Sequence, residues 1–380
     1  MRSTFHPDEP FFRLSRLPAA STYWRYVDSQ GINQAKSVLK VADMLRERVW
    51  QLCGLQYPRV QINIDTTVKT VFGSQQSARK GHNTQHRGKL GLRPILGFIE
   101  ETREYLVGKL RKGATVSGQE AAAFIADIQN HLPGCVREVL LRADGEFLSW
   151  ESVQAAMAAG FDFIIAIGGC TPVFDPGSWY RPWKRKAVEF NSCFYRPGGW
   201  DQACRFVAMR ITKEQKPPSK QPQQCVLFED DKYTYRIFCT NLAGSAHPII
   251  IEYDKRADVE NLVGEAKREG LDMIPSAKFK NNYAFFQIVM LAQKSVSAAS
   301  EKVGVMKGIV ANTVRIARLK LLFIAAKVVQ DGNRDKIKYS VHDARTPEML
   351  SFLHFLDNRR GQTKPWLNPG CWPQRFALPV

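Results

Sequence analysis

The strongest constraint on the fold is a change of hydrophobic period near residue 57. From Ser37 to Leu52, apolar residues recur at helical spacing, which predicts an amphipathic helix. In YPRVQINID, apolar and polar residues alternate instead, and this pattern predicts a strand with one buried face that leads into Asp65. The chain is therefore expected to place a short helical region, residues 1–56, before a sheet.

The order of elements after Asp65 indicates the class of sheet. Two strand-like runs at 94–100 and 104–110 precede SGQEAAAFIADIQNHL, a helix that begins with a capping-box sequence. REVLLRAD then predicts a strand that ends at Asp144, SWESVQAAMAAG a helix that stops at Gly160, and FDFIIAIGG a further strand. This order is typical of a ribonuclease H-like α/β fold, a mixed sheet flanked by helices.

The composition changes after residue 169. Aromatic, basic and proline residues become frequent, and CRFVAMRIT, CVLFED and YTYRIFCTNL predict short strands, so we interpret this part as a β-rich insertion. Helical patterns return in PIIIEYDKRADVENLVGEAKREG and at about 281–302 and 307–330. The expected domains are a helical N-terminal region (1–56), a split catalytic domain (57–169 and 248–335), the insertion (170–247) and a C-terminal tail (336–380).

The charge balance indicates a polyanionic partner. The sequence has 54 Lys and Arg against 36 Asp and Glu, a formal charge of +18, and such surfaces most often bind nucleic acid or anionic membranes. The N-terminus has no signal-peptide core, and no apolar run reaches the roughly 18 residues that a membrane span needs. The eight cysteines form no CxxC pair, which argues against a zinc ribbon. We expect a soluble cytoplasmic protein.

One predicted helical segment, residues 253–267, places an acidic residue on the same side as three hydrogen-bond donors. At about 100° per residue, Tyr253, Arg256, Glu260 and Lys267 fall on one narrow stripe of an α-helix. With Asp65 and Asp144, Glu260 would supply hard oxygen ligands for two Mg²⁺ ions roughly 3.5–4 Å apart, the arrangement of two-metal phosphoryl transfer.

Each of these residues also has a simpler interpretation. Asp65 and Asp144 alone would be ordinary strand-terminal residues that cap a turn. Arg256 and Lys267 alone would be solvated helix charges near Glu260. The catalytic hypothesis depends on the three acids occurring together.

The spacing in YDKRADVENLVGEAK resembles the Y-R-E-K signature of DDE-type bacterial insertion-sequence transposases. The similarity extends to IDTT around Asp65, LRADGEF around Asp144 and YRIFCTNL before the third acid. It covers most of the chain, from about Ser21 to Val329.

The resemblance implies a DNA transposase that cleaves at transposon ends and transfers the 3′ ends to target DNA. Asp65, Asp144 and Glu260 would then bind two Mg²⁺ ions, for which Mn²⁺ could substitute. Tyr253, Arg256 and Lys267 would contact DNA phosphates. The expected partner is double-stranded DNA, both transposon ends and target, bound by a homodimer associated with the bacterial nucleoid.

The insertion contains a second candidate DNA contact. WYRPWKRK mixes aromatic and basic residues without an acid, a composition that can follow a phosphate backbone and stack on bases. An aromatic mini-core with a solvated basic rim is an equally good interpretation. The residues concerned are Trp179, Arg181, Trp183, Lys184 and Arg185.

Two other functions remain open from the sequence. Residues 1–56 are shorter than the end-recognition region usual in this family, which favours a non-catalytic DNA-binding or inhibitory derivative. A nuclease on the same fold, acting on RNA or in repair, would need no inverted-repeat ends.

Overall fold

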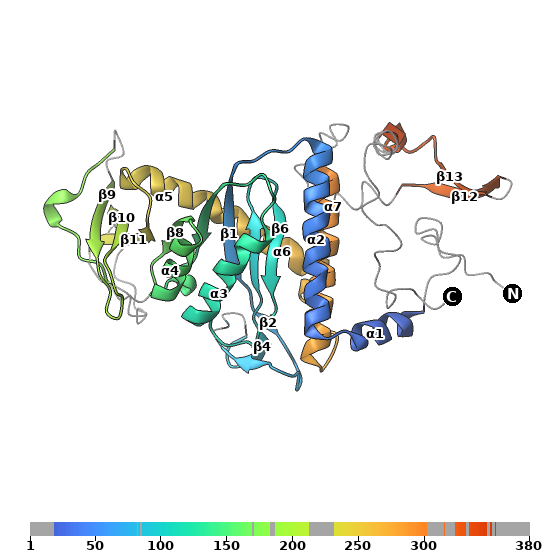
Figure 1. Ribbon diagram of the computed structural model, residues 1–380, viewed down its shortest axis with the longest axis horizontal. Coiled ribbons are helices and arrows are strands. Elements are labelled where there is room, and N and C mark those ends of the chain that lie inside the picture. The colour runs from blue at the N-terminus through green and yellow to red at the C-terminus, as the bar shows by residue number, and fades with distance from the viewer. Residues whose placement is uncertain are drawn as a thin grey trace, which may run out of the picture. The chain divides into compact units, whose positions relative to one another are not determined.

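The computed structural model describes residues 19–81, 83, 86–168, 171–182, 187–212, 232–301, 315, 324–331, 334–347, 350–351 and 354. The chain divides into two compact units, shown in Figure 1. The larger unit comprises Arg25–Glu47 and Gln56–Lys294, and the smaller comprises Met1–Trp24, Arg48–Leu55 and Ser295–Val380.

The larger unit is built on one eight-stranded mixed sheet with the order β6-β5-β1-β7-β8-β11-β10-β9. Strands β1 and β7 are parallel, as are β7 and β8, whereas β5 and β6 run antiparallel to their neighbours. These five strands are β1 (Arg59–Thr66), β5 (Ile95–Ile99), β6 (Glu104–Lys109), β7 (Glu138–Ala143) and β8 (Asp162–Ala166). Their order confirms the predicted ribonuclease H-like fold.

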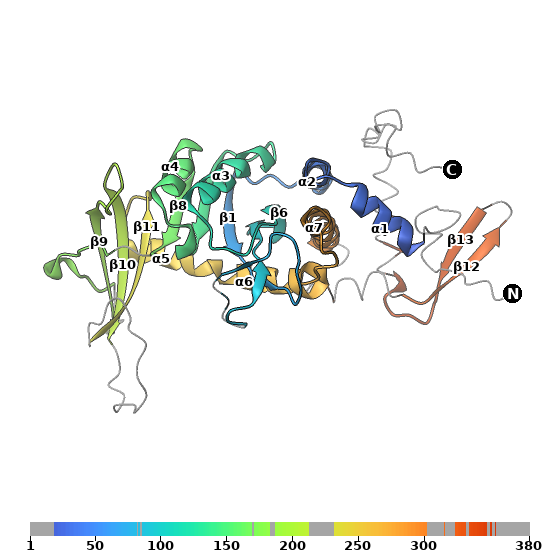
Figure 2. The same cartoon turned by 90° about the horizontal axis from the view of Figure 1, so that it is seen from below.

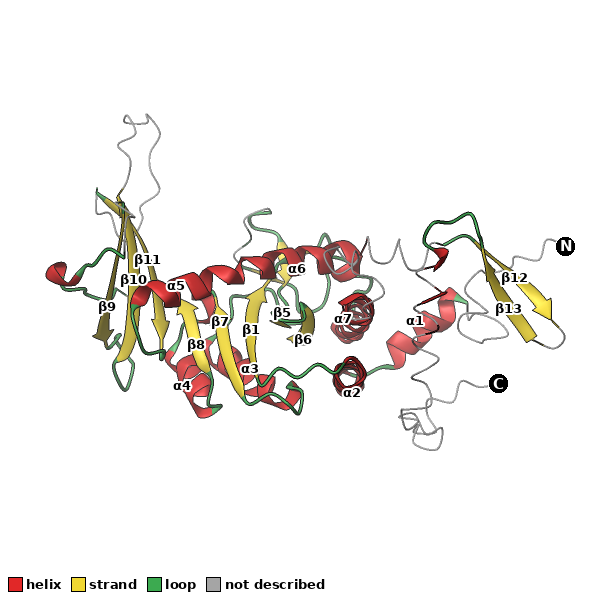
Figure 3. Cartoon of the chain, turned by 90° about the horizontal axis from the view of Figure 1, so that it is seen from above, coloured by secondary structure: helices red, strands yellow, loops and turns green. Residues whose placement is uncertain are grey.

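Helices cover both faces of this sheet. Helices α3 (Gly118–Ile128) and α4 (Trp150–Ala158) lie on one face, and α5 (Ala246–Asp254) and α6 (Asp258–Ala266) lie on the other, as Figures 2 and 3 show. The predicted capping box is present, since the Ser117 side chain accepts from the Glu120 amide and Glu120 accepts from the Ser117 amide. Gly160 ends α4 with a φ of 70°, a left-handed conformation that favours glycine.

The β-rich segment after residue 169 extends the main sheet. Strand β11 pairs antiparallel with β8, and β10 and β9 follow in hairpin order. The added strands are β9 (Val188–Tyr195), β10 (Cys204–Thr212) and β11 (Tyr233–Thr240). Phe190, Val207 and Phe238 share a buried cluster with Leu140 of β7 and with α5, so the added strands and the central strands have a common core. The predicted strand CVLFED lies outside the described residues.

Three further short strands separate β1 from β5. They form a small sheet with the order β2-β4-β3, which was not predicted from the sequence. Their bounds are β2 (Lys69–Thr70), β3 (Arg79–Lys80) and β4 (Leu90–Leu92).

Two long helices lie at the β6 edge. The buried guanidinium of Arg46, on α2 (Ile32–Cys53), donates to the carbonyls of Tyr105 and Leu106. Gln287, on α7 (Phe279–Glu301), donates to the Gly108 carbonyl at 2.9 Å. Helix α2 confirms the predicted N-terminal helix, and α1 (Ala20–Ser29) precedes it.

The helix expected at 307–330 is wrong at its C-terminal end. Residues Ala326–Asp331 form strand β12, which pairs antiparallel with β13 (Arg334–Tyr339). The β-branched pair Val328 and Val329 favours a strand. None of the helices in the described ranges is long and apolar enough to cross a membrane.

Candidate active site

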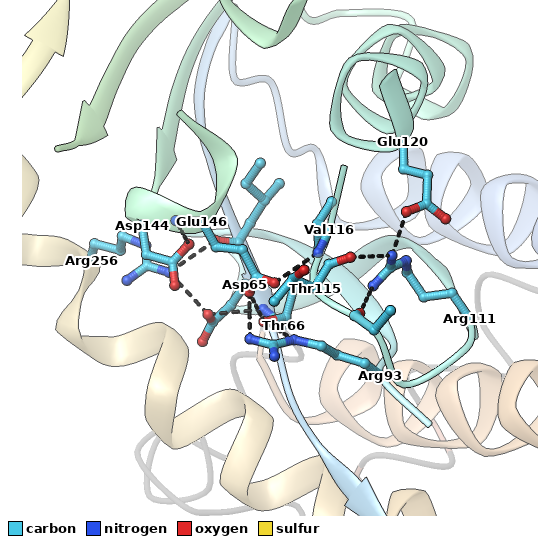
Figure 4. Close-up of polar contacts among 12 residues, drawn as sticks. Asp65, Thr66, Arg93, Arg111, Thr115, Val116, Glu120, Asp144, Glu146 and Arg256 are labelled. Atoms are coloured by element: carbon cyan, nitrogen blue, oxygen red, sulfur yellow. Dashed lines mark hydrogen bonds and ion pairs between the residues drawn. The ribbon is translucent and has the colours of Figure 1, made fainter. Parts of the chain in front are cut away.

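Asp65 and Asp144 lie at the same edge of the sheet. Asn63 of β1 is paired with Arg142 of β7 in parallel register, so the acid two residues further along each strand emerges beside the other. Asp144 follows β7 directly, and its side chain caps the short helix η2 (Gly145–Phe147) by accepting from the Glu146 amide. Figure 4 shows the two carboxylates close together.

A close backbone approach holds the loop that carries Asp144. A Cβ atom built on Gly145 would lie 2.5 Å from the Ile167 carbonyl oxygen, and one on Gly168 would meet the Gly145 carbonyl. Only glycine leaves room for this approach. The loops after β7 and β8 are therefore fixed against each other beside the site.

Both aspartates bind protons more tightly than usual. Burial raises the pKa of Asp65 to about 6, although Arg256 opposes the shift, and the charges of Asp144 and Glu260 add to it. Burial also raises the pKa of Asp144, again against Arg256 and with Glu146 adding to the rise. The edge is thus a desolvated, electronegative place that a cation would stabilise.

The segment with the Tyr-Arg-Glu-Lys spacing is not one uniform α-helix. Helix α5 passes into a 3₁₀ turn, η4 (Lys255–Ala257), then α6, and then a π-helical turn, η5 (Lys267–Leu271), that contains Gly270 at a φ of 120°. The expected stripe assumed a constant 100° per residue, and that assumption is wrong. The changes of pitch give each of the four side chains its own environment.

Two of the four side chains point into the sheet edge. Arg256 is buried, with Nη2 3.2 Å from Asp65 Oδ1 and 2.9 Å from the Ile64 carbonyl oxygen. Tyr253 donates through its hydroxyl to the Ala143 carbonyl at 3.3 Å. Each residue therefore contacts the backbone next to one of the two aspartates.

The other two side chains are more open. Glu260 is exposed on α6, and Lys267 is half-buried in the π-helical turn. Lys267 lies within electrostatic range of the buried Lys69 on β2. Burial lowers the pKa of Lys69 to about 7, against the effect of Asp272, and Lys267 lowers it further.

The donor chemistry of this edge fits a divalent cation. Asp65 and Asp144 offer carboxylate oxygens, the ligand atoms that Mg²⁺ prefers. Burial raises the pKa of both groups, and a bound cation would stabilise their ionised form. In the described part of the chain, no three His, Cys, Asp or Glu side chains are gathered closely enough to hold a metal ion. The exposed position of Glu260 accords with this finding.

Glu146 is a site residue that the sequence analysis missed. It accepts from Thr66 Oγ1 at 2.8 Å, from the Val116 amide at 2.9 Å and from Arg93 at 2.5 Å, as Figure 4 shows. These contacts join the ends of β1 and β7 to the loop before α3. The Asp-Gly-Glu sequence after β7 was the available signal.

Arg142 is a second missed residue. It is fully buried, and it donates to Asn63 Oδ1 at 2.8 Å, to Glu100 at 2.6 Å and to the Glu252 carbonyl at 2.6 Å. The last contact fixes the end of α5 immediately before Tyr253. Arg142 thus connects the strand that leads to Asp144 with the helical segment that carries Arg256.

A family model for the transposase DDE domain group 1 matches residues 12–360. The chain belongs to this transposase family. The match covers nearly the whole chain and bears out the resemblance drawn from the Tyr-Arg-Glu-Lys spacing. No curated protein sequence matches the chain.

Among solved structures, this transposase-family chain is similar to the piggyBac transposase in its synaptic complex with hairpin DNA. The TM-score is 0.41 and the sequence identity 11%, over 85% of this chain and 58% of that chain. The chain therefore spans little more than half the length of that transposase. The fold assignment rests on the strand order described above.

The insertion of this transposase-family chain presents a cation between aromatic rings. The Arg210 guanidinium lies 4.1 Å from the Trp179 ring centroid and 4.3 Å from that of Tyr233. Arg181 is exposed and pairs with Glu189, which also binds Arg210. Trp183, Lys184 and Arg185 lie outside the described residues.

Proposed function

We propose that the protein is a DNA transposase that cleaves at transposon ends and transfers the 3′ ends to target DNA by two-metal phosphoryl transfer. The observation that carries the proposal is the meeting of Asp65 and Asp144 at one desolvated edge, with Arg256 of the signature segment paired to Asp65. Family membership supports the same chemistry.

Asp65, Asp144 and Glu260 would hold two Mg²⁺ ions, with Mn²⁺ able to replace them. When bound, such ions activate the attacking oxygen and stabilise the leaving oxygen of the phosphodiester. Arg256 holds Asp65 in place and offsets negative charge at the edge until a cation is bound. Glu260 would complete the acidic set from α6, and its charge acts on Asp65.

Duplex DNA would be bound as two transposon ends and a target, by a homodimer. In this proposal Lys267, whose charge acts on the buried Lys69 of β2, binds a DNA phosphate. The Tyr253 hydroxyl donates to the Ala143 carbonyl and the Arg256 guanidinium to the Ile64 carbonyl. In this proposal both side chains contact a DNA phosphate where it lies beside the two aspartates. Trp179 and Arg181 of the insertion would offer a further contact.

A second candidate function is a non-catalytic DNA-binding or inhibitory derivative of a transposase. One observation favours it: Glu260 is exposed and lies outside any gathered group of metal-ligating side chains within the described ranges. The same basic surface would serve either function.

The deciding experiment uses a donor plasmid with the native flanks of the gene, incubated with purified protein in Mg²⁺ or Ca²⁺. The variants Asp144→Asn and Glu260→Gln remove proposed metal ligands. Glu138→Gln is a matched control. Glu138 is the first residue of β7, the strand that leads to Asp144, and its side chain is 66% exposed.

Breaks at the flank boundaries that need Mg²⁺, Asp144 and Glu260, and that persist in Glu138→Gln, would support the transposase. Binding without any break in Mg²⁺ would favour the non-catalytic derivative. Cleavage at the wild-type rate by Glu260→Gln would overturn the proposed acidic set.

A further inference from the structure

Strands β12 and β13 form a separate two-stranded ribbon in the smaller unit. Their antiparallel register runs from Ala326 opposite Tyr339 to Asp331 opposite Arg334. The Ser340 amide continues the pairing by donating to the Ala325 carbonyl at 2.7 Å. A ribbon of this size is marginally stable by itself, so what its faces contact decides its role.

The register gives the ribbon two different faces, because alternate residues of a strand lie on opposite sides. Positions on one face hold four basic residues and one acid, and we call this the basic face. The other face is mainly apolar. The basic face comprises the pairs Lys327/Lys338, Val329/Lys336 and Asp331/Arg334, and the apolar face comprises Ala326/Tyr339, Val328/Ile337 and Gln330/Asp335.

The like-charged pair on the basic face is the informative feature. Lys327 and Lys338 are directly opposite each other and both are exposed. Neither has an ion-pair partner among the residues that the structure describes. Like charges directly opposite on neighbouring strands destabilise a ribbon, and an anion placed over the pair would remove the repulsion.

Tyr339 stands at one end of the apolar face. Tyr339 is half-buried, and burial raises the pKa of its hydroxyl. Lys327 and Lys338, on the basic face, are exposed and can reach a partner.

We propose that the basic face of the β12–β13 ribbon binds the phosphate backbone of duplex DNA, with the ribbon lying in the major groove. The major groove, about 12 Å wide, admits a two-stranded ribbon, and lysines on its open face reach phosphates along the groove walls. The inference rests on the proposed function for its choice of DNA as the polyanion. It adds a binding surface distant in sequence from the acidic edge.

The test compares two double variants in the full-length protein. Lys327→Gln with Lys338→Gln removes the charge pair, and Lys327→Arg with Lys338→Arg keeps the charge at the same positions. Thermal unfolding of all three proteins checks that the ribbon variants remain folded. Affinity for a short duplex is measured over a series of salt concentrations in Ca²⁺.

Each lost phosphate contact should lower the slope of log K against log salt by about 0.9. The Gln variant should therefore lose about 1.8 from the slope and bind about 30-fold more weakly at 0.15 M salt, taking 1 M as the reference. The Arg variant should keep the wild-type slope.

An unchanged slope in a folded Gln variant would overturn the ribbon proposal while leaving the proposed function intact. A reduced slope together with no cleavage by the wild type would support the ribbon and count against the transposase activity. Weakened binding to vesicles of anionic lipid, with duplex binding unchanged, would also overturn it.

Discussion

Arg256 reaches from the signature segment to Asp65, and its Nη2 atom lies 3.2 Å from the carboxylate. It donates in addition to the carbonyl of Ile64, the residue before that aspartate. The arginine therefore fixes the helical segment to the end of β1 and also sets the charge of the acidic edge. These two roles can be separated by substitution.

Arg256→Gln should move the acidic limb of the pH–rate profile for DNA cleavage upward by about one pH unit. Arg256 opposes the rise in pKa of both Asp65 and Asp144, so its loss lets both values rise and delays their ionisation. Arg256→Lys should keep the limb near its wild-type position. Arg236→Gln, which removes a half-exposed pair with Asp254 and a cation–π contact with Phe238, is the control. An acidic limb that stays in place in Arg256→Gln would contradict this role.

Arg142→Gln should lower the free energy of unfolding by about 3–5 kcal/mol, because it leaves buried partners unpaired. Denaturant unfolding in metal-free buffer measures the effect. Arg59→Gln is the control, since Arg59 is half exposed and makes only surface pairs with Glu138 and Asp162; its loss should cost less than about 1 kcal/mol. Similar losses in the two variants would show that Arg142 has no special structural role.

Gly145→Ala should destabilise the protein by about 1–3 kcal/mol and reduce cleavage, since the new methyl group would collide with the Ile167 carbonyl. The loop would have to shift and would move Asp144 with it. Gly198→Ala, where a Cβ meets nothing within 4 Å, should leave both stability and cleavage unchanged. If Gly145→Ala had wild-type stability and cleavage, the backbone near Ile167 would have to move away from the new methyl group without a loss of free energy.

Two groups of the larger unit act in opposite directions on its stability between about pH 6.5 and 9: the contribution of His131 falls as the pH rises, and that of Lys69, whose pKa burial lowers to about 7, grows. Burial acts to lower the pKa of His131, but hydrogen bonds to Asp127 and Asp43 outweigh it and raise the pKa to about 9. The charged imidazole therefore contributes fully below the unfolded pKa, and its contribution, at most about 3 kcal/mol, is lost as the pH passes the folded value.

Unfolding free energies across this pH range test the role of His131. His131→Gln should remove the falling component, so that its unfolding free energy rises more with pH than that of the wild type, whereas His86→Gln, in a loop where the ring contacts Phe72, should keep the wild-type profile. A His131→Gln profile parallel to that of the wild type would show that His131 does not contribute to the pH dependence.

The sequence was sufficient for the ribonuclease H-like strand order and for the position of both aspartates. Alternation and capping are local signals, and parallel pairing of β1 with β7 brings Asp65 and Asp144 together once the order is known. The domain boundaries and the DNA contacts of Tyr253, Arg256 and Lys267 stay predictions.

The parts that could not be predicted depend on distant partners. Arg142 stands in an apolar strand, and its burial makes sense only with Asn63, Glu100 and the Glu252 carbonyl, which come from other elements. The 3₁₀ and π-helical turns on either side of α6 cannot be predicted from a sequence pattern that assumes a constant α-helical period. Residues 326–330 were misassigned because a short apolar run suits a helix as well as a strand.

The pairing of β11 with β8 has a practical consequence for shortened versions of this protein. Deleting residues 170–247 would leave the backbone amides and carbonyls of β8 unpaired along an open edge, and such edges promote aggregation. It would also remove Phe190, Val207 and Phe238 from a core shared with β7 and α5. The insertion cannot be trimmed as a loop, and soluble fragments must retain all three of its described strands.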